Sequence, residues 1–181
     1  MTFSDKLSVL YSRDEIASKI KLLAKQISRD YKDKNPLLIS ILKGSFMFTA
    51  DLIRELDFPL EVEFVRLSSY GKGTKSSGKI EVIQGVIFEV ENRHVLIVED
   101  IIDSGLTIEF LKDQLKEKKA ASVKVCALSS KPSQHTVPVD IDYIGFYIPD
   151  KFVVGYGLDY NQKFRNLPDI CILEENKQQG G

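Results

Sequence analysis

The chain has 181 residues, of which 43% are hydrophobic and 28% are charged, and its formal net charge is −1. This length suits a single domain over residues 1–181, and the balanced charge provides no global attraction to nucleic acid or to an acidic membrane surface. No apolar run approaches the roughly 20 residues of a membrane span, and the first residues do not resemble a signal peptide, so we expect a cytoplasmic protein.

The first half of the chain predicts alternating helices and strands. A helix should begin with the capping box Ser12-Arg13-Asp14-Glu15 and continue as an apolar stripe to about Tyr31. Residues 37–42 form a continuous apolar run typical of a buried strand, and a helix is expected over 44–56. Residues 60–67 alternate as in a strand with one solvated face, and a short strand should cover 80–84.

The second half continues the same alternation. We expect a strand over 95–98, a helix over 106–118, and further strands over 122–128 and 141–147. This order favours an α/β fold with an open, mostly parallel twisted sheet and helices on both faces. Cys126 and Cys171 each lie in an apolar, strand-like run, which favours buried, reduced thiols over a disulfide or a metal site.

The linker over 68–79 differs in composition from the rest of the chain. It contains three glycines, four serines and no aliphatic residue, so it cannot form a packed core of its own. Long segments of this kind within a compact domain are usually functional or disordered. Two interpretations stay open here: a loop that closes over an active site, and a soluble hairpin tip.

Residues 95–107, Val-Leu-Ile-Val-Glu-Asp-Ile-Ile-Asp-Ser-Gly-Leu-Thr, form the most informative segment. They predict a buried strand that ends at the adjacent carboxylates Glu99 and Asp100, followed by a tight turn and a helix. Carboxylates there suit the hydroxyls of a sugar or a metal, and the backbone amides of a helix start suit a phosphate. A simple helix cap at Asp103 or Ser104 would explain one polar residue, but not the paired carboxylates.

Three other segments carry polar or aromatic groups near predicted strand ends. Lys43-Gly44 lies between a strand and a helix, Lys131 follows a strand, and residues 150–160 contain two glycines and three aromatic residues. Each has an ordinary alternative: a strand-to-helix turn, a solvated lysine and a small packed flap. Aromatic faces beside a carboxylate would equally provide a platform for a planar base.

Residues 95–107 closely resemble the 5-phosphoribosyl-1-pyrophosphate (PRPP) motif of the type I phosphoribosyltransferases. Leu-Lys-Gly at 42–44, Ser69-Tyr70, Lys-Pro-Ser at 131–133 and Pro-Asp-Lys-Phe-Val-Val-Gly-Tyr-Gly-Leu-Asp-Tyr at 149–160 occur with the motif, in order. Together they resemble the hypoxanthine(-guanine) branch of that family over about residues 5–173. The resemblance implies the type I fold, with a core over about 35–148 and a small hood from the N-terminal segment and about 149–175.

The resemblance also implies a role for each matching residue. Asp103 is the catalytic base at purine N7, and PRPP binds, through its ribose and 5-phosphate, to Glu99, Asp100, Asp103, Ser104, Gly105, Leu106 and Thr107. Pyrophosphate lies against Lys43, Gly44 and Arg165, where the peptide bond leading into the loop is often a non-proline cis bond, and a mobile lid carries Ser69 and Tyr70. The purine contacts Lys131, Phe152, Val153 and Asp159, and Mg²⁺ is held by Glu99, Asp100 and Asp159.

The implied reaction uses PRPP and hypoxanthine or guanine, and yields inosine or guanosine monophosphate and pyrophosphate. The resemblance also implies a homodimer or homotetramer, with no nucleic acid and no membrane as a partner. The alternative is a regulatory protein on the same fold that binds PRPP without significant turnover. One departure is Gln134-His135, where bacterial members usually carry basic residues; we interpret His94 and His135 as structural.

Overall fold

The computed structural model describes residues 7–69 and 80–174. No helix in these two ranges is long and apolar enough to cross a membrane. In chain order the elements are β1 (Leu7–Tyr11), α1 (Arg13–Tyr31), β2 (Leu37–Leu42), α2 (Phe46–Arg54), β3 (Glu61–Ser69), β4 (Ile80–Gln84), β5 (His94–Ile102), α3 (Leu106–Glu117), β6 (Ser122–Ser130), the 3₁₀ turn η2 (Pro132–Gln134), β7 (Tyr143–Tyr147), β8 (Val153–Val154) and β9 (Ile170–Leu173).

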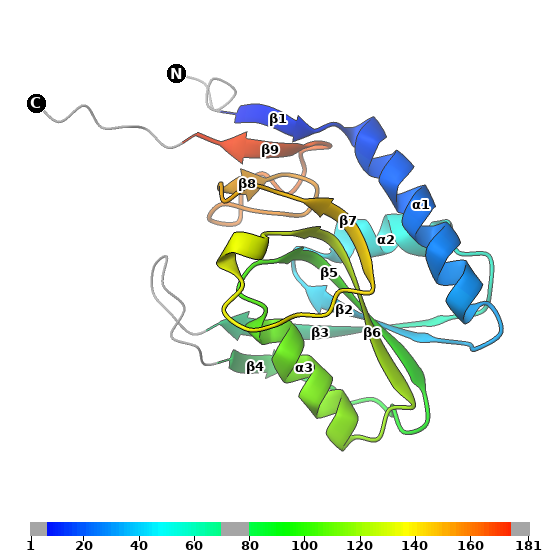
Figure 1. The fold of residues 1–181 in the computed structure, drawn as a ribbon. Helices are drawn as coiled ribbons and strands as arrows, with labels where there is room; N and C mark the ends of the chain where they lie inside the picture. The colour runs from blue at the N-terminus through cyan, green and yellow to red at the C-terminus, as the bar shows by residue number, and fades with distance from the viewer. Residues whose placement is uncertain (1–6, 70–79, 175–181) are drawn as a thin grey trace, which may run out of the picture.

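The larger sheet has six strands in the order β4-β3-β2-β5-β6-β7. All neighbouring strands are parallel except β3 and β4, which pair in antiparallel fashion. Helices α1 and α2 cover one face of this sheet and α3 covers the other (Figure 1). The predicted α/β class, with a mostly parallel sheet between two helical layers, is therefore confirmed.

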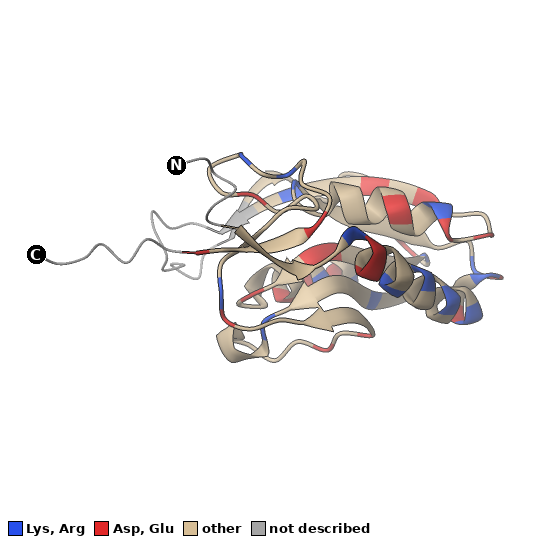
Figure 2. Ribbon diagram, turned by 90° about the horizontal axis from the view of Figure 1, so that it is seen from above, with Lys and Arg blue, Asp and Glu red and all other residues tan. Residues whose placement is uncertain are grey.

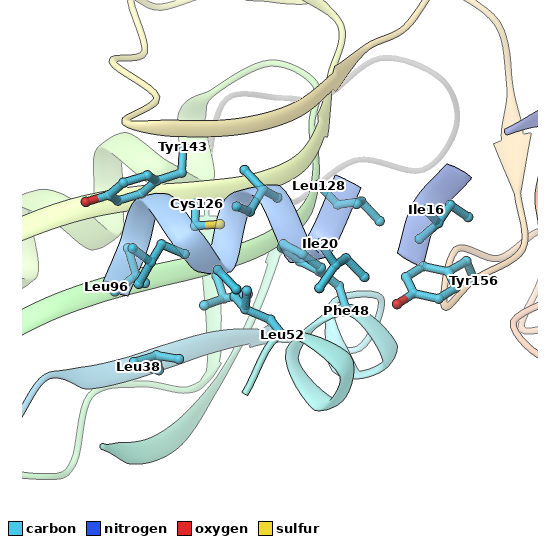
Figure 3. Packing of buried hydrophobic residues seen from close by; sticks show 14 of the residues in the cluster. Ile16, Ile20, Leu38, Phe48, Leu52, Leu96, Cys126, Leu128, Tyr143 and Tyr156 are labelled. Atoms are coloured by element: carbon cyan, nitrogen blue, oxygen red, sulfur yellow. The ribbon is translucent and has the colours of Figure 1, made fainter. Parts of the chain in front are cut away.

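Side chains of the central strands alternate between two hydrophobic cores, because successive residues of a strand point to opposite faces. Leu38 and Leu96 pack with α1 and α2, whereas Ile39 and Ile97 pack with α3. Figure 3 shows the first core, in which Phe48 and Leu52 of α2 lie beside the side chains of α1 and the sheet. Cys126 belongs to this core; both cysteines are buried and free, as predicted.

A second, three-stranded sheet has the order β1-β9-β8, and we call this sheet, with the segment that joins β8 to β9, the hood. Its pairs are antiparallel, with Leu7 opposite Leu173 and Val153 opposite Ile172. The chain therefore brings an early segment and a late segment together beside the larger sheet (Figure 1). This arrangement places the segment around Val153 next to the strand ends of the larger sheet.

Some predicted boundaries are wrong, and two of these errors concern the site. Strand β5 continues to Ile102 because its ladder with β6 persists, with Glu99 opposite Ala127, so the two carboxylates lie within the strand and not after it. Helix α2 begins at Phe46, two residues later than predicted, because Lys43 and Gly44 belong to the loop before it. The helix ends at Arg54, two residues earlier than predicted. The capping box that starts α1 is present as predicted.

Acidic and basic residues are interspersed along the helices seen in Figure 2. One partly buried network combines both signs: Lys124 Nζ lies 2.6 Å from Asp30 Oδ2, and the Tyr143 hydroxyl also donates to Asp30. The hydrogen bond from Lys124, followed by that from Tyr143, lowers the pKa of Asp30. The network fixes the end of α1 against β6 and β7, whose carboxyl ends lead toward the site.

Candidate active site

A cavity of about 480 Å³ lies where β2, β5 and β6 end and the hood begins. Ligands of open α/β sheets bind at this carboxyl edge of the strands. The cavity brings together eleven of the predicted site residues: Lys43, Gly44, Glu99, Asp100, Asp103, Thr107, Lys131, Phe152, Val153, Asp159 and Arg165. These residues come from segments that are far apart in the sequence, so their convergence supports one shared site.

The two carboxylates of β5 form the floor of this cavity. Glu99 Oε2 is buried and has no hydrogen-bond partner among the described residues. Burial, together with the neighbouring Asp100, raises the pKa of Glu99 well above its usual value. Burial also raises the pKa of Asp100 to about 6, whereas hydrogen bonds from backbone N–H groups and, less strongly, the charge of Arg165 act in the opposite direction. An unpartnered buried acceptor of this kind suits a ligand hydroxyl or a cation.

The start of α3 differs from a helix that is capped by Asp103 or Ser104. Its N-cap is Gly105, with φ +86°, so neither Asp103 nor Ser104 occupies that position, although Ser104 Oγ accepts a 3.4 Å bond from Leu106 N. The Ser104 carbonyl accepts from the backbone N–H of Thr136 at 2.9 Å. Asp103 and Thr107 line the cavity, whereas phosphate contact by Ser104, Gly105 and Leu106 stays a prediction.

The loop between β2 and α2 lies directly over Asp100. The Leu42–Lys43 peptide bond is cis, as the resemblance implies. A Cβ atom on Gly44 would lie 1.6 Å from Asp100 Oδ2, and one on Gly157 would lie 2.1 Å from the Gly44 carbonyl oxygen. Only glycine therefore fits at either position, and the loop is held between the sheet and the hood.

Gly44→Ala should lower kcat/KM for PRPP, the substrate that the resemblance implies, by about 10²-fold or more. The added methyl group cannot coexist with the Asp100 carboxylate, and displacements of about 1 Å can cost this much. Steady-state kinetics and thermal unfolding of the variant would measure it. Gly85→Ala is the matched control, since its Cβ would meet only the side chain of Val82. Wild-type kinetics in Gly44→Ala would show that the loop can move away without loss of function.

The hood segment supplies a second polar cluster at the cavity. Asp159 Oδ1 lies 2.7 Å from Arg165 Nη2, and Asp159 Oδ2 accepts from the Gln162 backbone N–H at 2.7 Å. Gln162 Oε1 accepts from Lys43 Nζ at 3.0 Å and from Arg165 at 3.3 Å. Sequence reasoning missed Gln162, which lines the cavity and joins the loop to the hood. In the sequence it is only a polar residue in a turn.

A second cavity, of about 670 Å³, adjoins the first and shares Asp103, Lys131 and Phe152 with it. Lys131 is only 8% exposed and forms no ion pair with any described residue. Phe152 is 46% exposed as a residue, and its ring meets Tyr160 edge to face at 5.5 Å between ring centroids. An accessible aromatic face beside a buried lysine suits a planar, polar molecule.

The Gln134-His135 pair lies beside this second cavity, with each residue bonded to a neighbour. Gln134 Nε2 donates to Asp150 Oδ2 at 2.5 Å, and His135 Nε2 lies 3.0 Å from the hydroxyl of Ser130. His94 likewise bonds Ser122, which agrees with structural roles for both histidines.

The predicted metal ligands line the cavity but are not gathered around one point. Within residues 7–69 and 80–174, no group of three His, Cys, Asp or Glu side chains could hold a metal ion as it stands, so the set Glu99, Asp100 and Asp159 stays a proposal. Ser69 ends β3, and Tyr70, with most of the expected lid, lies outside the described residues. Arg66 and Ile83, which line the cavity, were not predicted.

Comparison with known proteins gives a consistent result. Residues 8–161 match the sequence profile of the phosphoribosyl transferase domain. The chain is 49% identical over 175 residues to a hypoxanthine-guanine phosphoribosyltransferase of Streptococcus pneumoniae, covering 97% of each chain. It superposes with a TM-score of 0.90 on a hypoxanthine phosphoribosyltransferase of Staphylococcus aureus, at 39% identity and 94% coverage of both chains.

A further structural relative is the hypoxanthine phosphoribosyltransferase of Trypanosoma cruzi, with a TM-score of 0.86 and 42% identity. The alignment covers 92% of this chain and 91% of that one. Sequence, fold and cavity thus agree, and the chain belongs to the hypoxanthine(-guanine) branch of the type I phosphoribosyltransferase family.

Proposed function

We propose that this protein transfers the 5-phosphoribosyl group of PRPP to N9 of hypoxanthine, and also of guanine, in purine salvage. The products are inosine or guanosine monophosphate and pyrophosphate. The observation that carries this proposal is the pair of adjoining cavities with three shared residues, Asp103, Lys131 and Phe152. One cavity has the carboxylates and cations expected for PRPP, and the other has the aromatic face expected for a base.

During transfer of the phosphoribosyl group, positive charge develops on the ribose ring and negative charge on the departing pyrophosphate, and both must be stabilised. The bond between the anomeric carbon and pyrophosphate breaks, the bond to purine N9 forms, and Asp103 accepts the proton from N7. Glu99 and Asp100 orient the ribose hydroxyls and favour the positive charge that develops on the ring. Lys43, Arg165 and the backbone at Gly44 stabilise the negative charge of the departing pyrophosphate.

Mg²⁺ is the proposed cofactor, held by Glu99, Asp100 and Asp159 together with oxygen atoms of the substrate. The unpartnered buried Oε2 of Glu99 fits a cation, and Mg²⁺ is commonly bound by one or two carboxylates plus substrate phosphates. When bound, the ion neutralises charge on the pyrophosphate. On the purine side, Lys131 donates to the 6-oxo oxygen, Phe152 stacks on the ring, and Val153 and Asp159 contact the base edge.

Formation of inosine monophosphate from hypoxanthine, PRPP and Mg²⁺, followed by chromatography, tests the proposal directly. A reaction with ribose 5-phosphate in place of PRPP is the control, because it lacks the leaving group. A protein that binds PRPP calorimetrically but forms no nucleotide would instead fit the regulatory alternative, which the relationship to transferases disfavours. We further propose that the protein forms a homodimer or homotetramer, which sedimentation would test. We also propose that it is cytoplasmic, which cell fractionation would test.

A further inference from the structure

Three hydroxyl groups form a buried chain beneath the loop that contains Lys43 and Gly44. Ser40 comes from β2, Ser45 from the start of α2 and Thr49 from within α2, and their exposed fractions are 0%, 0% and 2%. Ser40 Oγ lies 2.7 Å from both Ser45 Oγ and Thr49 Oγ1. Ser45 Oγ in turn donates to the Ile41 carbonyl at 2.6 Å.

The direction of this chain follows from counting protons. Each hydroxyl has one proton to donate and can accept at its oxygen. The Ser45 proton is committed to Ile41, so Ser40 must donate to Ser45; Thr49 must then donate to Ser40. All three bonds therefore run toward the Ile41 carbonyl, and each can strengthen the next by polarisation.

The side chain of Ser45 does not make the hydrogen bond that is usual at its position in a helix. A serine at a helix N-cap ordinarily accepts a hydrogen bond from the helix backbone. Ser45 is the N-cap of α2 but makes no such side-chain bond; its hydroxyl instead reaches back to Ile41. This contact joins the two ends of the segment Leu42-Lys43-Gly44 and closes it into a loop.

We propose that Ser45 is a positioning residue for the pyrophosphate loop, and that Ser40 and Thr49 hold its hydroxyl in the donating orientation. The proposal rests on the proposed function, in which this loop receives pyrophosphate. Because Gly44 already lies against Asp100 and Gly157, the loop has little freedom once its ends are tied. The hydroxyl chain thus acts through the loop backbone and touches no substrate.

The alternative is that the three hydroxyls merely satisfy one another in the core. Comparing the binding of pyrophosphate with the binding of inosine monophosphate distinguishes the two interpretations. The pyrophosphate subsite lies on the loop, whereas inosine monophosphate occupies only the base, ribose and 5-phosphate positions. A positioning role therefore weakens binding of pyrophosphate but not of the nucleotide, and a purely structural role affects neither or both.

Ser45→Ala should weaken pyrophosphate binding roughly tenfold, because the Ile41 carbonyl and the Ser40 hydroxyl each lose a buried partner. KM for PRPP should rise by a similar factor, and Kd for inosine monophosphate should stay within about twofold of wild type. Product-inhibition kinetics and calorimetry measure these constants. Tyr31→Phe is the matched control: it removes a buried hydroxyl bond to Val95, at the opposite end of β5, and should leave pyrophosphate binding unchanged.

Wild-type affinity of Ser45→Ala for pyrophosphate would overturn the proposal, as would an equal loss of pyrophosphate and nucleotide binding. Should Ser45→Ala fail to fold, Ser40→Ala carries the test, since it leaves the bond to Ile41 but removes the group that orients Ser45. A loss of about threefold in pyrophosphate affinity supports the proposal, and no loss overturns it. A wild-type protein that neither forms nucleotide nor binds pyrophosphate would contradict the proposed function itself, before any variant is compared.

Discussion

Adenine should be used about 10⁴-fold less efficiently than hypoxanthine, measured as the ratio of kcat/KM for the two bases at saturating PRPP. Lys131 is buried in the wall shared by both cavities and has no described ionic partner, so its ammonium group is available to an acceptor on the ligand. A lysine can donate but cannot accept, so it pairs with a 6-oxo oxygen and opposes a 6-amino group. Sites built around such a bond discriminate by 10⁴ to 10⁵.

Variants can assign this selectivity to a single residue. Lys131→Met should remove most of the discrimination by lowering kcat/KM for hypoxanthine while adenine changes little. Lys118→Met, which removes an exposed lysine after α3, should leave the ratio as in wild type. Comparable use of adenine and hypoxanthine by the unmodified protein would refute the assignment of Lys131 to the 6-position.

Asp103→Asn should lower kcat by about 10²- to 10⁴-fold, the range that a well-placed general base contributes. Asparagine keeps the shape of the side chain but cannot accept a proton. Asp103 lines both cavities and is not the N-cap of α3, so the substitution should leave the fold intact. Pre-steady-state rates of nucleotide formation measure the chemical step, and calorimetry measures PRPP binding, which should change much less.

The control for this variant is Asp113→Asn, which alters an exposed carboxylate within helix α3 and should leave kcat unchanged. A near-normal rate for Asp103→Asn would exclude proton transfer to this residue. The proton at N7 would then have to leave by another route, such as a water molecule.

Local sequence patterns predicted most of the fold. The apolar run at 37–42 and the motif at 95–107 identified two central strands, and both strands contribute to the cavity. The extent of β5 could not be predicted, because Glu99 and Asp100 are poor strand residues that stay in the ladder through pairing with β6. Tertiary pairing here overrides local preference.

The functional residues that were missed depend on contacts between distant segments. Gln162 has no motif of its own, and its role is visible only because Lys43 reaches it from the loop after β2. Ser40 is one polar residue in an apolar strand, and nothing in that strand shows that its partners lie in the next helix. Motifs thus identify groups that contact a ligand more readily than groups that hold those residues in place.

The pairing of β1 with β9 has a consequence for the order in which the protein folds. β8, which carries Val153, finds its partner only when β9 has been synthesised, and β1 must wait for the same strand. The segment from β2 to α3 needs no part of β8 or β9 for its own strand pairs. Because contacts between distant segments form late, we expect the segment from β2 to α3 to assemble before β8 and β1 pair with β9.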